Sequence, residues 1–396
     1  MDAYGYSISK YGSRPQNQVR LHGVFLTAGI LVKRLVAALW ILLILNALGQ
    51  SSASAAQPGI DWITEASAAD NEWISVTYGN GLFVAVSGDG AGNRVMTSPD
   101  GITWTSRTSA ADNVWESVTY GNGLFVAVSG DGAGNRVMTS PDGIAWTSRT
   151  SAADNDWYSV TYGNGLFVAV SQTTGTGNRV MTSPNGITWT IRTSAADSRW
   201  RSITFGNGLF VAVGFTPGTP PNPNPNPDIG NVMTSPNGIT WTSQTPAAGP
   251  HWNSVTYGQG LFVAVSLDGD TMTSPDGITW TSRTPAAYDS WSGITYGNGL
   301  FVAVSASGTG NQVMTSPDGI TWTSRIAAAN NAWTSVTSGN GLFVAVSDDG
   351  AGNRVMISPP PSAPASVPSL SEWTQLLLGL LVMTMIGWHF HRERSY

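Results

Sequence analysis

Hydrophobic and polar positions along the chain follow the pattern of short β-strands. Within residues 115–150 (WESVTYGNGLFVAVSGDGAGNRVMTSPDGIAWTSRT), the first segment, WESVTY, alternates polar and apolar side chains, as a half-buried strand does. The next, LFVAVS, is almost continuously apolar, which is typical of a strand buried on both faces. RVMTS and IAWTSRT, at residues 136–140 and 144–150, complete a unit of four predicted strands. The segments between them contain the Gly, Asn, Asp and Pro residues that tight turns require.

This unit occurs seven times. The copies begin at Trp73, Trp115, Trp157, Trp200, Trp252, Trp291 and Trp333, and the steps between them are 42, 42, 43, 52, 39 and 42 residues. A period of about 40 residues with four strands indicates a β-propeller or another repeat array. One such sheet cannot bury both of its faces, so neighbouring copies must stack. The two Trp residues of each copy are the largest apolar groups available to fill the space between the sheets.

The two ends of the array favour a closed ring. The last copy stops at residues 356–359 (MISP) without a fourth strand, and the missing piece, residues 58–64 (PGIDWIT), precedes the first copy. An N-terminal strand that completes the last sheet closes a ring, whereas an open array would need capping repeats. We therefore predict an all-β fold, a seven-bladed β-propeller of four-stranded blades over residues 57–359.

The N-terminal segment, residues 1–56, has the pattern of a secretory signal peptide with a long basic leader. Basic residues, among them Arg14, Arg20, Lys33 and Arg34, precede an apolar run at residues 35–48, and residues 53–55 (ASA) form a small-residue cleavage site. This pattern predicts a signal helix and export of the protein. The alternative is an uncleaved membrane anchor.

The C-terminal segment has a different organisation. A Pro-rich linker at residues 360–366 leads to residues 367–396, which contain the motif VPSLSEW, an apolar stretch and the basic end HRER. The 17 residues from 374 to 390 are at the short end of the length of a transmembrane helix. Basic residues after this helix favour a cytoplasmic C-terminus, so the propeller is expected outside the cytoplasmic membrane.

This three-part segment resembles the IPTL-type sorting signal of Gram-negative bacteria, in which I-P-T-L-S-E-W precedes a helix and an Arg-rich tail. The residues that match the motif include Pro368, Ser371, Glu372 and Trp373. Val367 and Ser369 depart from the usual Ile and Thr. The resemblance implies an exosortase-like sorting protease as a partner. It also implies a protein that is membrane-anchored or on the cell surface in a Gram-negative envelope.

The turn before the fourth strand recurs in six copies as S-P-[DN]-G-I-x-W. Its acidic or amide residues are Asp100, Asp142, Asn185, Asn237, Asp276 and Asp318. The turn resembles the Asp-box of sialidase-like (BNR repeat) propellers, S-x-D-x-G-x-T-W, with one residue fewer between Asp and Gly. In that family the box joins the third and fourth strands and stabilises the blade away from the active site. The resemblance therefore implies a fold and a structural role for these turns.

Composition excludes several functions. Residues 57–360 contain 21 acidic and 11 basic side chains, a net charge of about −10, so we do not expect nucleic acid as a partner. The chain has no Cys and therefore no disulfide framework. No loop between second and third strands offers more than two carboxylates, whereas Ca²⁺ takes roughly six to eight oxygens. We expect no metal and no cofactor.

A sialidase-like exported glycoside hydrolase is the main alternative function. Those enzymes use an arginine triad, a Tyr–Glu pair and an Asp acid/base. Nine of the 11 propeller arginines occupy two equivalent repeat positions, and only Arg199 and Arg201 stand outside them. The propeller glutamates, Glu65, Glu72 and Glu116, do not single out the pair of carboxylates that a glycosidase requires. We predict that the protein is not an enzyme.

The copies differ most on either side of the blade Trp. The residue before it is Glu72, Val114, Asp156, Arg199, His251, Ser290 or Ala332. The residue after it is Ile74, Glu116, Tyr158, Arg201, Asn253, Ser292 or Thr334. Strand alternation predicts that both positions lie on one side of the first strand. This is the end of the propeller that carries the insertion PNPNPNP, residues 221–227.

Tyr158, Arg199, Arg201 and His251 belong to consecutive copies, and we predict that they cluster on one arc as a binding site. Arg pairs with carboxylates in a bidentate fork, and Tyr offers a ring with a polar tip, so an acidic glycan or a peptide carboxylate is the candidate ligand. The alternative explanation of the variation is drift of unconstrained loops.

The sequence thus predicts an exported, surface-sorted, non-catalytic propeller that acts as a binding or structural module at the cell envelope. The alternatives are the sialidase-like hydrolase and a passive component of the extracellular matrix.

Overall fold

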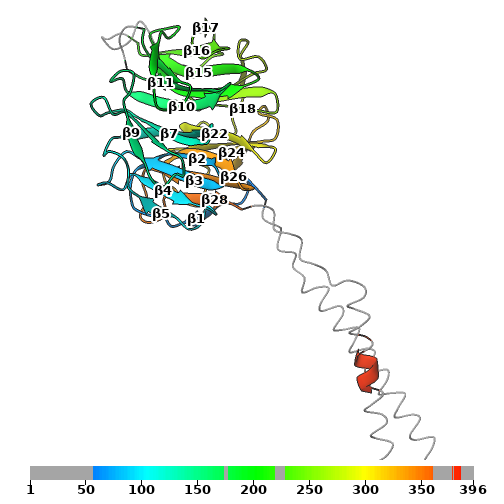
Figure 1. The fold of residues 1–396 in the computed structure, drawn as a ribbon. Coiled ribbons are helices and arrows are strands. Elements are labelled where there is room, and N and C mark those ends of the chain that lie inside the picture. The colour runs from blue at the N-terminus through cyan, green and yellow to red at the C-terminus, as the bar shows by residue number, and fades with distance from the viewer. Residues whose placement is uncertain (1–56, 174–176, 219–227, 360–376, 378, 385–396) are drawn as a thin grey trace, which may run out of the picture. The chain divides into compact units, whose positions relative to one another are not determined.

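The computed structural model describes residues 57–173, 177–218, 228–359, 377 and 379–384. It contains seven antiparallel sheets of four strands each (Figure 1). The seven-bladed propeller with four-stranded blades is therefore confirmed. Blade 1 consists of β2 to β5, blades 2 to 6 follow in chain order, and blade 7 consists of β26, β27, β28 and β1.

Each blade is a meander whose first strand contacts the first strands of both neighbouring blades. The first strands are β2 (Trp73–Gly79), β6 (Trp115–Gly121), β10 (Trp157–Gly163), β14 (Arg199–Gly206), β18 (Trp252–Gly258), β22 (Trp291–Gly297) and β26 (Trp333–Gly339). The second strands are β3 (Leu82–Ser87), β7 (Leu124–Ser129), β11 (Leu166–Ser171), β15 (Leu209–Thr216), β19 (Leu261–Ser266), β23 (Leu300–Ser305) and β27 (Leu342–Ser347).

The third and fourth strands complete the blades toward the outside. The third strands are β4 (Val95–Ser98), β8 (Val137–Ser140), β12 (Val180–Ser183), β16 (Ile229–Ser235), β20 (Thr271–Ser274), β24 (Val313–Ser316) and β28 (Val355–Ser358). The fourth strands are β5 (Thr105–Arg107), β9 (Thr147–Arg149), β13 (Thr190–Arg192), β17 (Thr242–Gln244), β21 (Thr281–Arg283), β25 (Thr323–Arg325) and β1 (Ile63–Glu65).

The hairpin between the first and second strands depends on two residues with positive φ. In blade 1 these are Asn80, with φ of 50°, and Gly81, with φ of 75°. Two consecutive residues in this region form a type I′ turn, whose twist matches that of the flanking strands. Blade 5 has Gln259 at the Asn position, and it takes the same conformation with φ of 48°.

The fourth strand is shorter than the sequence predicts. In blade 2 the Oδ1 atom of Asp142 accepts hydrogen bonds from the N–H groups of Ile144 and Ala145, at 2.9 and 3.0 Å. These bonds hold both residues in the turn, so β9 begins at Thr147 and not at Ile144. The same bonds lower the pKa of the Asp142 carboxyl, because they stabilise its ionised form.

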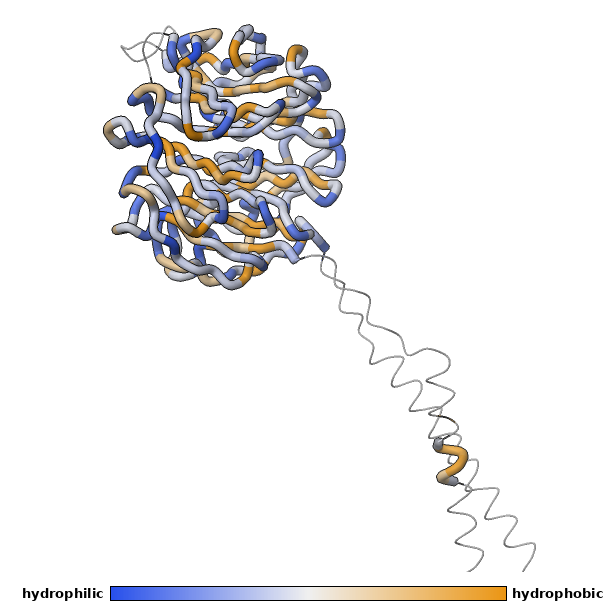
Figure 2. The backbone as a smooth tube through the Cα atoms, in the orientation of Figure 1, coloured by the Kyte–Doolittle hydropathy of each residue, from blue (hydrophilic) through white to orange (hydrophobic). Residues whose placement is uncertain are grey.

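The hydrophobic core consists of seven clusters, one at each interface between blades. Between blades 2 and 3, Val126 and Val128 pack against Trp157 and Phe167, and all four side chains are fully buried. Figure 2 shows the apolar strand interiors and the hydrophilic loops at their ends. Because the interface between blades 7 and 1 has its own cluster, the ring is closed.

The closing strand predicted at residues 58–64 is present. In β1, Ile63 pairs with Ile357 and Thr64 with Met356 of β28, antiparallel (Figure 1). Ahead of it, the Gly59 N–H donates to the Ser358 hydroxyl at 2.6 Å, as the Gly101 N–H donates to the Ser98 hydroxyl in blade 1. The seventh turn of the repeat is thus assembled from both ends of the array.

Several predicted segments lie outside the described residues. They are the signal peptide at residues 1–56, the linker at residues 360–366 and the sorting motif around Pro368 to Trp373. Of the predicted helix at residues 374–390, the structure describes Leu377 and residues 379–384, which are helical. Within the described ranges, no helix has both the length and the apolar character needed to span a membrane.

Candidate ligand-binding site

The first strands of the blades are joined around the channel by serine side chains. The hydroxyl of Ser75 accepts a hydrogen bond of 3.2 Å from the N–H of Val118 in the next blade, and Ser117 accepts one of the same length from Val160. Six of the seven interfaces have this bond, whose donors are Val76, Val118, Val160, Ile203, Val255 and Ile294. Each hydroxyl keeps its own O–H as a donor.

A β-bulge places the variable residue after each blade Trp in the channel. In blade 3, Trp157 pairs with Ser171 and Ser159 with Val170, which leaves Tyr158 as the extra residue. A bulge turns a side chain away from the direction that simple alternation would give it. As a result, all seven residues at this position line one cavity of about 350 Å³ at the channel mouth.

The bulge also corrects one prediction. We expected the residues before and after the blade Trp to lie on one side of the strand, but only the residues after it line the cavity. Asp156 and Arg199, which precede the Trp in blades 3 and 4, line a separate depression together with Thr173. Alternation with a period of two cannot anticipate an extra residue in the strand.

Three of the seven cavity residues tie neighbouring blades together. The Asn253 side-chain amide donates to the backbone oxygen of Ser292 at 2.7 Å. The Thr334 hydroxyl donates to the Trp73 oxygen, also at 2.7 Å, and the Ser292 hydroxyl donates to the Trp333 oxygen. In blades 5, 6 and 7 these polar groups are therefore engaged in holding the ring together.

The other four, Ile74, Glu116, Tyr158 and Arg201, form what we call the recognition arc, in blades 1 to 4. The guanidinium carbon of Arg201 lies 4.6 Å from the centre of the Tyr158 ring and 5.6 Å from that of Phe215. This is the distance of a cation–π contact. The Arg201 Nε atom is buried and has no hydrogen-bond partner among the described residues.

Glu116 is the titrating group of the recognition arc. Burial and, to a smaller extent, the nearby charge of Asp156 raise the pKa of its carboxyl to about 7, although the charge of Arg201 opposes both effects. Burial also raises the pKa of Asp348, at another point of the cavity wall. Near neutral pH the cavity thus presents a partly protonated acid and a guanidinium side by side.

The structure brings three of the four predicted site residues together around Phe215, and the fourth, Tyr158, contacts one of them, Arg201. The guanidinium of Arg199 lies 5.9 Å from the centre of its ring, and the His251 ring meets it edge-on at 4.8 Å. Only Tyr158 and Arg201 line the cavity. Sequence reasoning missed Phe215 and Glu116, although Glu116 stands at a variable position and blade 4 has Gly-Phe where its neighbours have Ser-Gln and Ser-Leu.

His251 has structural partners. Its two ring nitrogens lie 2.6 Å from carboxylate oxygens of Asp228 and Asp268. Burial lowers the pKa of His251, but the hydrogen bonds and charges of the two carboxylates outweigh burial and raise it overall. Asp228 also accepts a hydrogen bond of 2.7 Å from the Gly218 N–H. His251 therefore braces the residues that flank the insertion, most of which lies outside the described residues.

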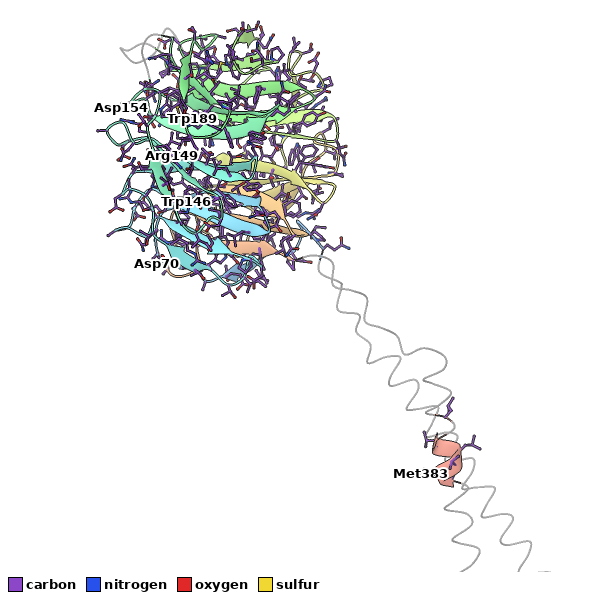
Figure 3. All side chains as sticks on the ribbon, viewed as in Figure 1. Asp70, Trp146, Arg149, Asp154, Trp189 and Met383 are labelled. Atoms are coloured by element: carbon purple, nitrogen blue, oxygen red, sulfur yellow. The ribbon has the colours of Figure 1, made fainter. Side chains whose placement is uncertain are left out.

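Several other charged residues bond within their own blades. Arg149 donates from Nε to the Thr139 hydroxyl at 2.9 Å and lies beside Trp189 of the next blade (Figure 3). Arg94 donates to the Gly90 oxygen at 2.8 Å, and Asp89 accepts from the Glu72 N–H at 2.6 Å. In the part of the chain that the structure describes, no group of three or more His, Asp or Glu is arranged to hold a metal.

Neither protein-family models nor curated proteins give a match to this chain. Among solved structures it is similar to YCF48 from Cyanidioschyzon merolae, at 12% identity and a TM-score of 0.55 over 76% of this chain and 98% of that one. A YCF48 structure bound to a D1 peptide matches at 14% identity and a TM-score of 0.57, over 79% and 100%.

The β-propeller domain of Cps50 (Swd1) from Myceliophteria thermophila matches at 9% identity and a TM-score of 0.53, over 76% of this chain and 100% of that one. At such low identities these similarities establish the propeller fold alone.

Proposed function

We propose that this protein is an exported, surface-sorted, non-catalytic propeller that binds a glycan or a peptide at its channel mouth. One observation carries the proposal. All seven of the variable residues that follow a blade Trp in the otherwise near-identical blades are brought into a single cavity. Loops that drift without constraint have no reason to place their variation in a shared cavity, whereas a concave site with a few convergent polar groups is typical of ligand binding.

The cavity supports binding over hydrolysis. The sialidase-like alternative requires three arginines on a substrate carboxylate, and Arg201 is the only arginine in the described lining of the cavity. Any anion at Arg201 would also meet the carboxyl of Glu116. Most of the other propeller arginines, such as Arg94 and Arg149, bond to groups within their own blades.

A peptide is a reasonable ligand because a similar propeller, YCF48, has been solved with a D1 peptide bound. The predicted signal peptide supports export, and the IPTL-like tail supports an exosortase-like partner and attachment to the cytoplasmic membrane through the predicted C-terminal helix. The Ser-Pro-Asp-Gly turns support a structural role of the kind that the Asp-box resemblance implies, because their side chains bond to the turn itself.

The proposal is tested by screening the full chain, in detergent micelles, against glycan and peptide arrays. Replacing both arginines, Arg199→Ala with Arg201→Ala, should weaken binding of any hit about tenfold, or about 1.4 kcal/mol, and leave the melting temperature unchanged. The matched control is Arg283→Ala with Arg325→Ala, which removes the same charge from fourth strands. Absence of any hit, or equal binding by the two double variants, would contradict a binding function at this mouth.

A further inference from the structure

The serine ring around the channel is interrupted at one point. The interface between blades 6 and 7 has Gly293 where the other six blades have a serine. The N–H of Val336, which is equivalent to the six donors of the ring, therefore has no serine hydroxyl to donate to. We call the space beside Gly293 the Gly293 niche.

The cavity extends into this niche. In blades 2 to 5 its lining ends at the serine of the ring, whereas at Gly293 it reaches the next residues, Ile294 and Val336. At the niche the cavity thus reaches the residue after the ring position in both blades, and one of these residues, Val336, has an amide donor that lacks the serine partner of its counterparts. An oxygen atom placed where the missing hydroxyl would lie could accept from the Val336 N–H, so the niche fits an oxygen-bearing group of a ligand.

The niche faces the recognition arc. In a closed ring of seven blades, the interface between blades 6 and 7 lies across the channel from blade 3, which carries Tyr158. Glu116 and Arg201 flank Tyr158 in blades 2 and 4. All of these residues line one continuous cavity of about 350 Å³, near the lower limit of small-molecule pockets.

The charges of the cavity disfavour an ionic ligand. An anion that pairs with Arg201 would approach the carboxyl of Glu116, and a cation that pairs with that carboxyl would approach Arg201. A neutral ligand avoids both like-charge contacts. The carboxylate of Glu116 still requires hydrogen-bond donors from a ligand, and the guanidinium of Arg201 requires acceptors. The serine hydroxyls offer further O–H donors to ligand oxygens.

We propose that the recognition arc and the Gly293 niche together bind one neutral polyol of monosaccharide size across the channel mouth. One hydroxyl oxygen of the sugar accepts from the Val336 N–H in the niche, and hydroxyls at its other end donate to Glu116 and accept from Arg201. This assignment rests on the proposed binding function. It specifies a neutral polyol as the ligand and the Gly293 niche as the second place where the protein contacts it.

The test uses saturation-transfer NMR on the full chain in detergent micelles, with glucose, galactose and mannose as neutral probes. Glucuronate and glucosamine are the matched anionic and cationic probes. We expect transfer to at least one neutral hexose, with the charged analogues at least tenfold weaker. Transfer only to a charged analogue, only to a dipeptide probe such as glycylglycine, or to no hexose would overturn the assignment.

The decisive variant is Gly293→Ser, which restores the sequence of the other blades. Its Cβ would lie 3.1 Å from the Ser335 Cα and 3.2 Å from the Thr334 oxygen, so small shifts of these neighbours are needed. We expect hexose binding to fall at least tenfold while the melting temperature stays equal or rises, because the hydroxyl fills the niche and accepts from Val336. Unchanged hexose binding in a folded Gly293→Ser protein would overturn the proposal.

A measurement on the unmodified protein keeps the test valid if that variant does not fold. With ¹⁵N-labelled valine, the amide resonance of Val336 should shift when the hexose that binds is added. An unchanged resonance at saturation would overturn the proposed contact between the sugar and the Gly293 niche. If array binding depends on Arg199 and Arg201 but not on Gly293, the niche fails and the proposed function stands.

Discussion

At the residue scale, Glu116 is the one carboxylic acid among the seven residues that follow a blade Trp, and the fold raises its pKa. It stands at the bulge position, inside the cavity, with Asp156 and Arg201 nearby. Burial raises its pKa from 4.5 to about 7, so the folded protein holds a proton that the unfolded chain has already released between these values. The contribution of Glu116 to the stability of the fold therefore falls as pH rises from about 4.5 to about 7, and levels off above that range.

Replacing this acid tests the assignment. Glu116→Gln should leave stability nearly unchanged near pH 5, where Glu116 is mostly protonated in the fold, and should raise it near pH 8 by up to about 3 kcal/mol. Thermal melts of both proteins at the two pH values measure the effect, with Glu72→Gln as the charge-matched control on the same end of the propeller. A stability difference that is the same at both pH values would show that Glu116 does not titrate in this way.

The turn residues allow a second prediction from substitutions that the chain already contains. Asn185 accepts the same two backbone hydrogen bonds in blade 3 that Asp142 accepts in blade 2. Asp142→Asn should therefore change stability by less than about 0.5 kcal/mol, whereas Asp142→Ala should cost about 1 kcal/mol. Chemical denaturation of both variants measures these changes in the free energy of unfolding. An equal decrease in the two variants would mean that the negative charge of Asp142 matters more than its role as a hydrogen-bond acceptor.

At the scale of elements, blade 7 is the only blade whose strands are distant in sequence. Its fourth strand, β1, is separated from β28 by almost the whole propeller. The turn that joins them is completed by the Gly59–Ser358 hydrogen bond and by the Trp62 indole, which donates to the Gly59 oxygen at 3.2 Å. Three strands in blade 7 would leave β28 as an exposed edge of buried residues.

Deletion of residues 57–65 should therefore abolish the single cooperative unfolding transition of the propeller. We expect a broadened or multi-step melt, or aggregation through the free edge of β28, measured by calorimetry and light scattering. Deletion of the insertion residues 219–227 serves as the control of equal length, because it removes no paired strand. A melt as sharp as that of the unmodified protein would contradict closure by β1.

For the whole molecule, we expect the propeller to determine folding and the predicted sorting segment to determine location. The ring closes on itself through a buried apolar cluster at the interface of blades 7 and 1, whereas the predicted sorting motif lies outside the described residues. If the tail is the sorting signal, location should depend on it and folding should not.

Truncation before residue 372 should move the protein from the membrane or surface fraction into the periplasm or the medium, with an unchanged melting temperature of the propeller. Fractionation of a Gram-negative host that has an exosortase-like protease measures the change. The matched control replaces Glu372 and Trp373 by Ala and keeps the helix. Identical fractionation of the truncated and full-length chains would refute the tail assignment.

The sequence alone determined the blade, its sevenfold repetition and the closing strand. These features are encoded by local patterns: strand alternation, turns rich in Gly and Pro, and a displaced fourth strand at residues 58–64. It also placed Tyr158 and Arg201 in one cluster, because consecutive blades are neighbours in a ring. Only the tertiary structure decided which variable residues enter the channel, since this depends on the bulge after each Trp. It alone showed the burial that raises the pKa of Glu116 and the niche beside Gly293, because both result from contacts between blades.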